Sequence, residues 1–161
     1  MVRCRPDSLA VLAAASVWFL APSGAVAQGS ARPESLHWSV PPVLPPGALI
    51  AVVSGDPTGP GEFTLLVSMP NGYRIPPHSH PSDEHVEVKE GTLLVGIGDL
   101  LDPKLTQALA AGDSATAPAG MHHFSIAKGR TLVSATFMGP YTITYVRAED
   151  APRPRNFPFG Y

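Results

Sequence analysis

The sequence has little charge and almost no cysteine. Only 15% of its 161 residues are charged and the formal net charge is -2, so the chain shows neither the basic footprint of a nucleic-acid-binding protein nor a charged tail. Its single cysteine, Cys4, lies near the N-terminus and has no partner for an internal disulfide. Stability must therefore come from the core, from strand pairing, and from a bound metal or a second subunit.

Long apolar runs are also scarce. Residues 9–21 form one continuous apolar run after a basic start, but the run is too short to span a bilayer comfortably. Small residues follow at Ala25 and Ala27, and this order is typical of a secretory signal peptide. We expect residues 1–27 to be removed by cleavage before Gln28, which predicts a periplasmic or secreted protein without membrane attachment. An uncleaved membrane anchor is the alternative.

Aromatic residues make up only 7% of the chain, whereas prolines number 19 and glycines 15, so many turns and short elements are expected. One helical turn is predicted at Pro103–Ala110. Short runs rich in β-branched residues, separated by turn residues, predict strands. These runs are residues 48–54, 62–69, 84–90, 92–98, 121–127, 131–138 and 141–146. The pattern predicts an all-β sandwich or barrel.

The two ends of the chain lack an apolar period and are interrupted by proline. We therefore predict a single domain at residues 43–147. An extended arm at residues 28–42 precedes it, and an extended proline-rich tail at residues 148–161 follows it.

Polar residues gather in the segment 72-GYRIPPHSHPSDEHVEVKEG-91. Alternate residues of a strand share a face, so His78 and His80 project together. Glu84 begins the next predicted strand and shares its face with Val86 and Val88, which places the carboxylate inward at the head of an apolar wall. An unpaired inward carboxylate is costly, so Glu84 needs a cation or a hydrogen-bond network. Two imidazoles and a carboxylate are a common ligand set for a divalent metal.

This segment resembles the first motif of the cupin superfamily. Gly72 is followed after five residues by His78-x-His80, after three more by Glu84, and after a further six by Gly91. A lone His-x-His would be a weak signal, but here the framing glycines and the glutamate are present as well.

A second stretch resembles the second cupin motif. Gly112 is followed after five residues by Pro118-x-Gly120, and after two more by His123. Ala127 stands where the family usually has asparagine. This departure concerns a contact near the pocket and not a metal ligand.

The resemblance implies a conical jelly-roll β-barrel that holds one divalent metal ion through His78, His80, Glu84 and His123. The ion would be Fe, Mn, Cu, Ni or Zn. The sequence contains one such pair of motifs, so it is similar to single-domain cupins, which often form homodimers. A small-molecule ligand or substrate would bind beside the metal.

Other polar residues lie close to the motifs. Arg74 shares the face of His78 if the strand is regular through Pro76, and its guanidinium could then bind a substrate carboxylate. His85 is out of phase with Glu84, and His122 faces away from its neighbour His123. We interpret both of these histidines as residues outside the ligand set.

A divalent ion bound by three neutral histidines and one carboxylate has a formal charge of about +1. If the ion is octahedral, two of its coordination positions stay open. Such a centre suits a small-molecule dioxygenase or oxidase. The alternatives are a non-catalytic protein that binds a metal or a small ligand, and a metal-dependent isomerase or decarboxylase. Their ligand sets can be identical, so the sequence alone does not separate them.

Overall fold

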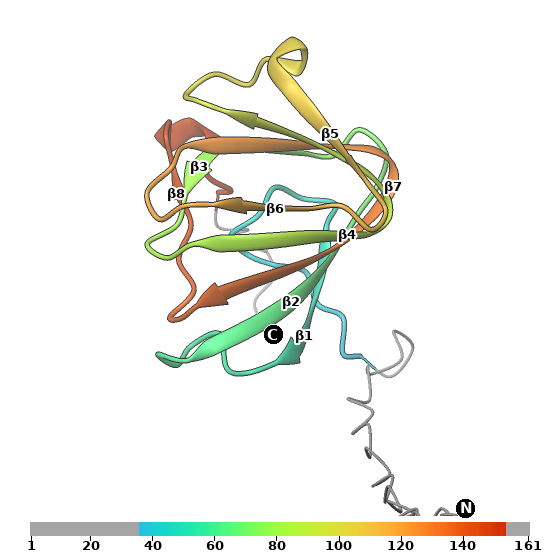
Figure 1. Cartoon of the computed structure of the whole chain (residues 1–161). Coiled ribbons are helices and arrows are strands. Elements are labelled where there is room, and N and C mark those ends of the chain that lie inside the picture. The colour runs from blue at the N-terminus through green and yellow to red at the C-terminus, as the bar shows by residue number, and fades with distance from the viewer. Residues whose placement is uncertain (1–35, 154–161) are drawn as a thin grey trace, which may run out of the picture. The chain divides into compact units, whose positions relative to one another are not determined.

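The computed structural model of the chain describes residues 36–153 (Figure 1). The predicted signal peptide, its cleavage site and the end of the predicted tail lie outside these residues. Within them, the helices are two short 3₁₀ turns, η2 (Pro103–Leu105) and η3 (Ala148–Asp150). None of the helices among the described residues has the length and hydropathy needed to cross a membrane.

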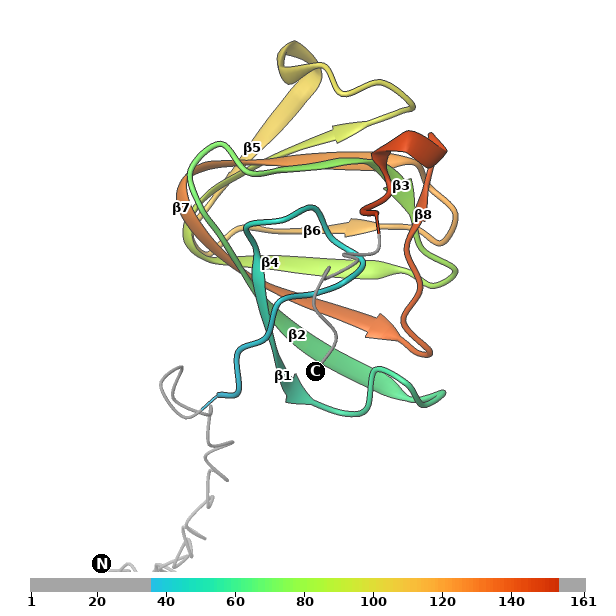
Figure 2. The same ribbon diagram turned by 180° about the vertical axis from the view of Figure 1, so that it is seen from behind.

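The fold is the predicted all-β jelly-roll barrel. Its strands are β1 (Leu49–Ser54), β2 (Glu62–Met69), β3 (Arg74–Ser79), β4 (Glu84–Ile97), β5 (Thr106–Ala110), β6 (Ser114–Ala117), β7 (His123–Met138) and β8 (Thr144–Tyr145). The segment before β1 lies along the barrel (Figure 2), where the backbone of Ser39 pairs with that of Ile50. The Tyr145 hydroxyl also donates a hydrogen bond to the carbonyl of Val43 at 2.9 Å.

Two long strands, β4 and β7, run through both halves of the barrel (Figure 1). In one half the strands follow the order β1, β2, β7, β4, β6, and in the other the order is β8, β3, β7, β4, β5. All of these pairs are antiparallel. Because β3, β4 and β7 each carry predicted ligands, this topology brings the two motifs together.

Both long strands contain a glycine at which they bend. Gly91 in β4 has φ 77° and Gly129 in β7 has φ 79°, a region that glycine enters without steric cost. The register of β4 against β7 shifts on either side of Glu90, as in a β-bulge. The prediction of separate strands around Gly91 was therefore wrong, and so was the separation of residues 121–127 from 131–138.

The bulge changes which residues of β4 face inward. Before it, Glu84 and Val86 line the interior cavity, whereas after it the odd-numbered Leu93 and Val95 do so. Val88, on the same face as Glu84, is fully buried. The predicted inward face of Glu84 is thus confirmed.

The structure also differs from the sequence prediction between residues 103 and 117. Only Pro103–Leu105 is helical, and Thr106–Ala110 forms β5 against the second half of β4. Strand β6 was not predicted, because Ser114–Ala117 is only four residues long and two of these are alanine, which is depleted in strands. Pairing with the first half of β4 overrides that weak preference. The last strand covers only Thr144–Tyr145 of the predicted residues 141–146.

Candidate metal centre

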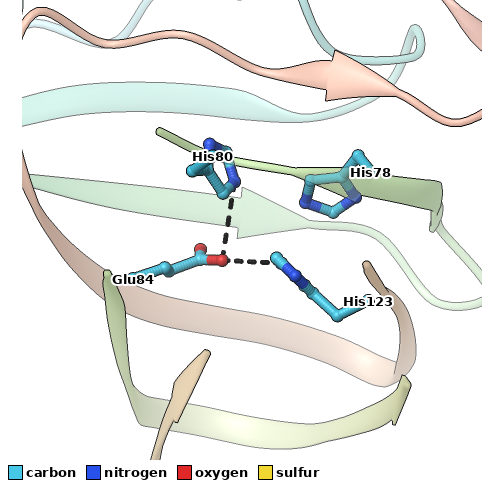
Figure 3. Close-up of side chains that lie close together, drawn as sticks. All are labelled: His78, His80, Glu84 and His123. Atoms are coloured by element: carbon cyan, nitrogen blue, oxygen red, sulfur yellow. Dashed lines mark hydrogen bonds and ion pairs between the residues drawn. The ribbon is translucent and has the colours of Figure 1, made fainter. Parts of the chain in front are cut away.

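The structure brings the four predicted metal ligands together (Figure 3). His78 lies on β3, His80 just after it, and Glu84 and His123 are the first residues of β4 and β7. The Cα atoms of His78 and His123 are paired across the β3–β7 ladder. One potential ligand atom from each side chain lies within 4.8 Å of all the others. The three histidines are buried, and none is more than 6% exposed.

All three imidazoles are oriented by backbone carbonyls. The Nδ1 atoms of His78, His80 and His123 lie 2.7, 2.7 and 3.0 Å from the carbonyl oxygens of Pro76, Thr142 and Met121 respectively. A carbonyl oxygen only accepts, so each Nδ1 carries the proton and donates it. Each Nε2 atom is then left to face the cluster, as is usual for histidines that bind metals.

The carboxylate of Glu84 connects two of these rings. Its Oε2 atom accepts a hydrogen bond from Nε2 of His123 at 2.8 Å and lies 3.6 Å from Nε2 of His80 (Figure 3). Since Nδ1 of His123 also carries a proton, this ring is a cation in the absence of a metal. A metal ion would take the place of that proton, as expected for a binding site built from ionisable ligands.

The pKa values agree with this arrangement. Burial alone would raise the pKa of Glu84, but the hydrogen bond from His123 and the charges of the histidines outweigh it and lower that pKa. Burial alone would lower the pKa of His123, but its contact with Glu84 raises it. Burial lowers the pKa of His78 to about 3, and it also lowers the pKa of His80. Neutral His78 and His80 therefore need lose no proton before they bind a metal.

The lowered pKa of His78 predicts acid sensitivity of the metal-free protein. The unfolded chain binds a proton near pH 6.5 that folded His78 binds only near pH 3, so stability falls as pH falls through this window. We expect His78 to lower the free energy of unfolding by about 1.4 kcal/mol for each pH unit of acidification. The measurement is the urea-unfolding free energy of chelator-treated protein between about pH 6 and pH 4.

His123 acts in the opposite direction, because its raised pKa makes protonation of the folded state favourable. The variant His78→Gln isolates the contribution of His78, and its pH slope should be smaller than that of the unmodified protein. His85→Gln, at an exposed position, is the control and should leave the slope unchanged. Equal slopes for His78→Gln and the unmodified protein would contradict the argument.

Arg74 does not join the cluster. It is exposed on β3, and the register of β3 against β7 shifts between Ile75 and His78. Because of this irregularity Ile75, not Arg74, lies on the cavity wall with His78. The assumption of a regular strand through Pro76 was wrong, and with it the geometric basis for Arg74 as a carboxylate-binding residue.

The neighbouring histidines lie outside the cluster, as predicted. His85 is exposed, and its Nδ1 atom lies 3.0 Å from the hydroxyl of Thr116. Nδ1 of His122 lies 2.6 Å from a carboxylate oxygen of Asp99. Ala127, where the cupin motif usually has asparagine, is 1% exposed in the hydrophobic core and is not on the cavity wall.

The cluster opens onto a cavity of about 420 Å³. Apolar side chains form most of the wall. Besides the four clustered residues, the polar side chains of the wall are Gln107, Thr116, Ser125 and Tyr141. No lysine or arginine of the described residues lines this cavity.

Sequence reasoning missed Tyr141, which lies beside the cluster. Its ring stacks on that of His80 with centroids 5.6 Å apart, and it meets the ring of Phe137 edge-on at 5.2 Å. Burial raises the pKa of its hydroxyl, and the charge of Glu84 raises it further. Tyr141 lies outside both motifs, so no spacing could have indicated it.

Comparison with known proteins agrees with the fold and the motifs. The Cupin domain family model matches residues 65–138, a range that contains all four clustered side chains. Residues 65–138 form a domain of the cupin superfamily. Among curated proteins, this cupin is 46% identical over 111 residues to germin-like protein 9-3 of Oryza sativa subsp. japonica. That alignment covers 63% of this chain and 49% of the rice protein, so the cupin spans about half of its relative.

Solved structures show the same fold. An oxalate oxidase is 26% identical to this cupin with a TM-score of 0.51, and the match covers 67% of this chain and 59% of the oxidase. The polyketide cyclase RemF from Streptomyces resistomycificus has a TM-score of 0.59 at 15% identity, covering 74% of this chain and 85% of the cyclase. The latter similarity concerns the fold alone.

Proposed function

We propose that this cupin binds one divalent metal ion through His78, His80, Glu84 and His123 and acts as a small-molecule oxidase or dioxygenase. The observation that carries the proposal is the position of these side chains, which are buried but face a cavity. A purely structural ion is normally enclosed by its ligands, whereas a catalytic ion keeps access to a substrate.

The residues fit a divalent ion. Nitrogen and carboxylate-oxygen donors suit iron, manganese, copper, nickel or zinc. A bound ion would supply Lewis-acid chemistry and, if redox-active, electron transfer. The chain itself orients the Nε2 donors through the carbonyls of Pro76, Met121 and Thr142. Glu84 supplies the one negative charge, and the apolar wall limits water beside the donors.

The similarity to an oxalate oxidase favours oxidase chemistry over the other reactions that such a site supports. The match covers only 59% of the length of that oxidase, so we do not assign its substrate to this protein. The predicted export through residues 1–27 and the predicted homodimer are also part of the proposal. The order of residues in 1–27 supports the first, and the resemblance to single-domain cupins supports the second.

The test is to strip the protein with a chelator, reload it with single metals, and follow dioxygen uptake with enols, catechols and flavonols. We expect uptake only with a redox-active ion, and none with zinc. If no redox-metal form consumes dioxygen, the oxidase proposal fails. Product analysis of the same mixtures then separates an isomerase or decarboxylase, which transforms a substrate without dioxygen, from a protein that only binds it.

A further inference from the structure

We propose that the cavity takes a ligand with an apolar body and a single ionisable oxygen head, such as a phenol, an enol or a monocarboxylate, and that it discriminates against small dianions. The inference rests on the proposed metal site and extends it to the class of ligand. It depends on three features of the cavity, namely its wall, its charge and its mouth.

The wall is apolar on most sides. Strands from both halves of the barrel contribute apolar side chains to it. These include Leu65, Val67, Val86, Val95, Leu109 and Val133. The volume of about 420 Å³ is within the range of pockets that enclose drug-sized molecules. A two-carbon dicarboxylate would leave most of this apolar surface uncovered, whereas a ring system would cover it.

The charge of the site favours a monoanion. The metal contributes two positive charges and Glu84 one negative charge, while the three histidines are neutral once they bind the metal. One anionic head therefore brings the centre to neutrality, whereas a dianion leaves a net negative charge. No lysine or arginine of the described residues lines the wall to compensate for it. An uncompensated charge in an apolar cavity is strongly unfavourable.

Besides Gln107 and Thr116, the polar part of the wall includes two hydroxyl groups that bear on the class of ligand. Ser125 is two residues beyond His123 on β7, and Tyr141 stacks on His80. Neither hydroxyl makes a hydrogen bond within residues 36–153. Each can donate or accept, so the pair suits a neutral oxygen on the ligand rather than a second full charge.

The mouth of the cavity is apolar as well. Ile97 and Leu105 belong to the wall, yet they are 68% and 70% exposed. Their side chains therefore form a lip at which an apolar ligand can enter. Leu100 provides a matched comparison, because it is 71% exposed but does not line the cavity.

The experiment uses the full mature protein loaded with nickel and kept free of dioxygen, so that the metal retains open coordination positions and binding is measured without turnover. The probes are 2-naphthoate, with one carboxylate, naphthalene-2,6-dicarboxylate, with the same ring and two carboxylates, and oxalate. We expect calorimetry to show that 2-naphthoate binds at least about a hundredfold more tightly than either dianion, because each dianion leaves one charge uncompensated. Equal or tighter binding of oxalate would overturn the inference.

Variants at the lip test the position of the ligand. Ile97→Lys brings to the cavity a cation that can compensate the second charge of a dianion. We therefore expect the ratio of the affinity for 2-naphthoate to that for the dianions to fall at least about tenfold. Leu100→Lys adds the same charge at equal exposure away from the wall and should leave the preference unchanged. Both positions are exposed, so the variants should fold, which circular dichroism checks. The same change in both variants would contradict a ligand at this lip.

A neutral probe separates this inference from the proposed function. Methyl 2-naphthoate has the ring but no charge, so the metal-free protein should bind it in the cavity. The variant Leu109→Lys, which places a charge at a buried wall position, should not bind the ester. The variant Leu100→Lys, away from the wall, should bind it as the unmodified protein does. Failure of the ester to bind folded protein would overturn the apolar-ligand inference. Failure to bind any metal would overturn the proposed function, whatever the ester does.

Discussion

Replacing Glu84 with alanine should lower the affinity for a divalent metal by at least about a hundredfold. The variant loses the one anionic ligand of the cluster, whereas loss of a group that only orients a ligand already costs about 10–100-fold. In the unmodified protein, metal at 100 times its dissociation constant should add about 2.7 kcal/mol to the free energy of unfolding. In the variant, the same metal concentration should add almost nothing. The measurements are the metal retained after dialysis and the urea-unfolding midpoint with and without metal. His80→Ala should behave in the same way.

Two neighbouring histidines provide the controls. His85 follows Glu84 on β4 but is exposed on the outer face, and His122 precedes His123 and contacts Asp99. Alanine at either position should leave metal retention at the level of the unmodified protein. If His85→Ala lost as much metal as Glu84→Ala, the site would not be the inward-facing cluster of Figure 3.

Part of this cluster was predictable from local information, whereas His123 joined it only through the resemblance to the second cupin motif. Alternation along a strand placed Glu84 on the same face as Val86 and Val88, and the structure confirms that this face is inward. The carbonyls that orient His78 and His123 each come from two residues earlier, which follows from a short extended segment. The carbonyl for His80 comes from Thr142, 62 residues away, and no local pattern could indicate it.

What the sequence could not predict are the irregularities of the strands. A glycine between two β-branched runs predicts a hairpin turn as readily as a bulge, and only the long partner strand decides between them. At Gly91 the partner β7 continues alongside β4, so the chain bends without reversing. The same kind of irregularity between Ile75 and His78 turned Arg74 away from the cavity. In both cases the pairing strand overrides local periodicity.

The bend at Gly91 leads to the prediction with the largest effect on stability. Gly91 and Gly129 have nearly the same backbone conformation, with φ of 77° and 79°. A methyl group at Gly129 would meet nothing within 4 Å, whereas at Gly91 it would overlap the carbonyl oxygen of Arg130 and crowd the backbone of Thr131. Alanine at either position bears the strain of a left-handed conformation, which costs about 1–2 kcal/mol. Alanine at Gly91 must in addition displace β7.

We therefore expect Gly129→Ala to lower the free energy of unfolding by about 1–2 kcal/mol and Gly91→Ala by about 2–5 kcal/mol, because overpacking adds about 1–3 kcal/mol to the strain. Urea unfolding of the two metal-free variants measures the difference. Gly91→Ala should also retain less metal, since β4 carries Glu84 before the bend and pairs after it with the His123 end of β7. Equal losses in the two variants would show that β7 yields freely at Arg130, and the bend would then not fix the ligands.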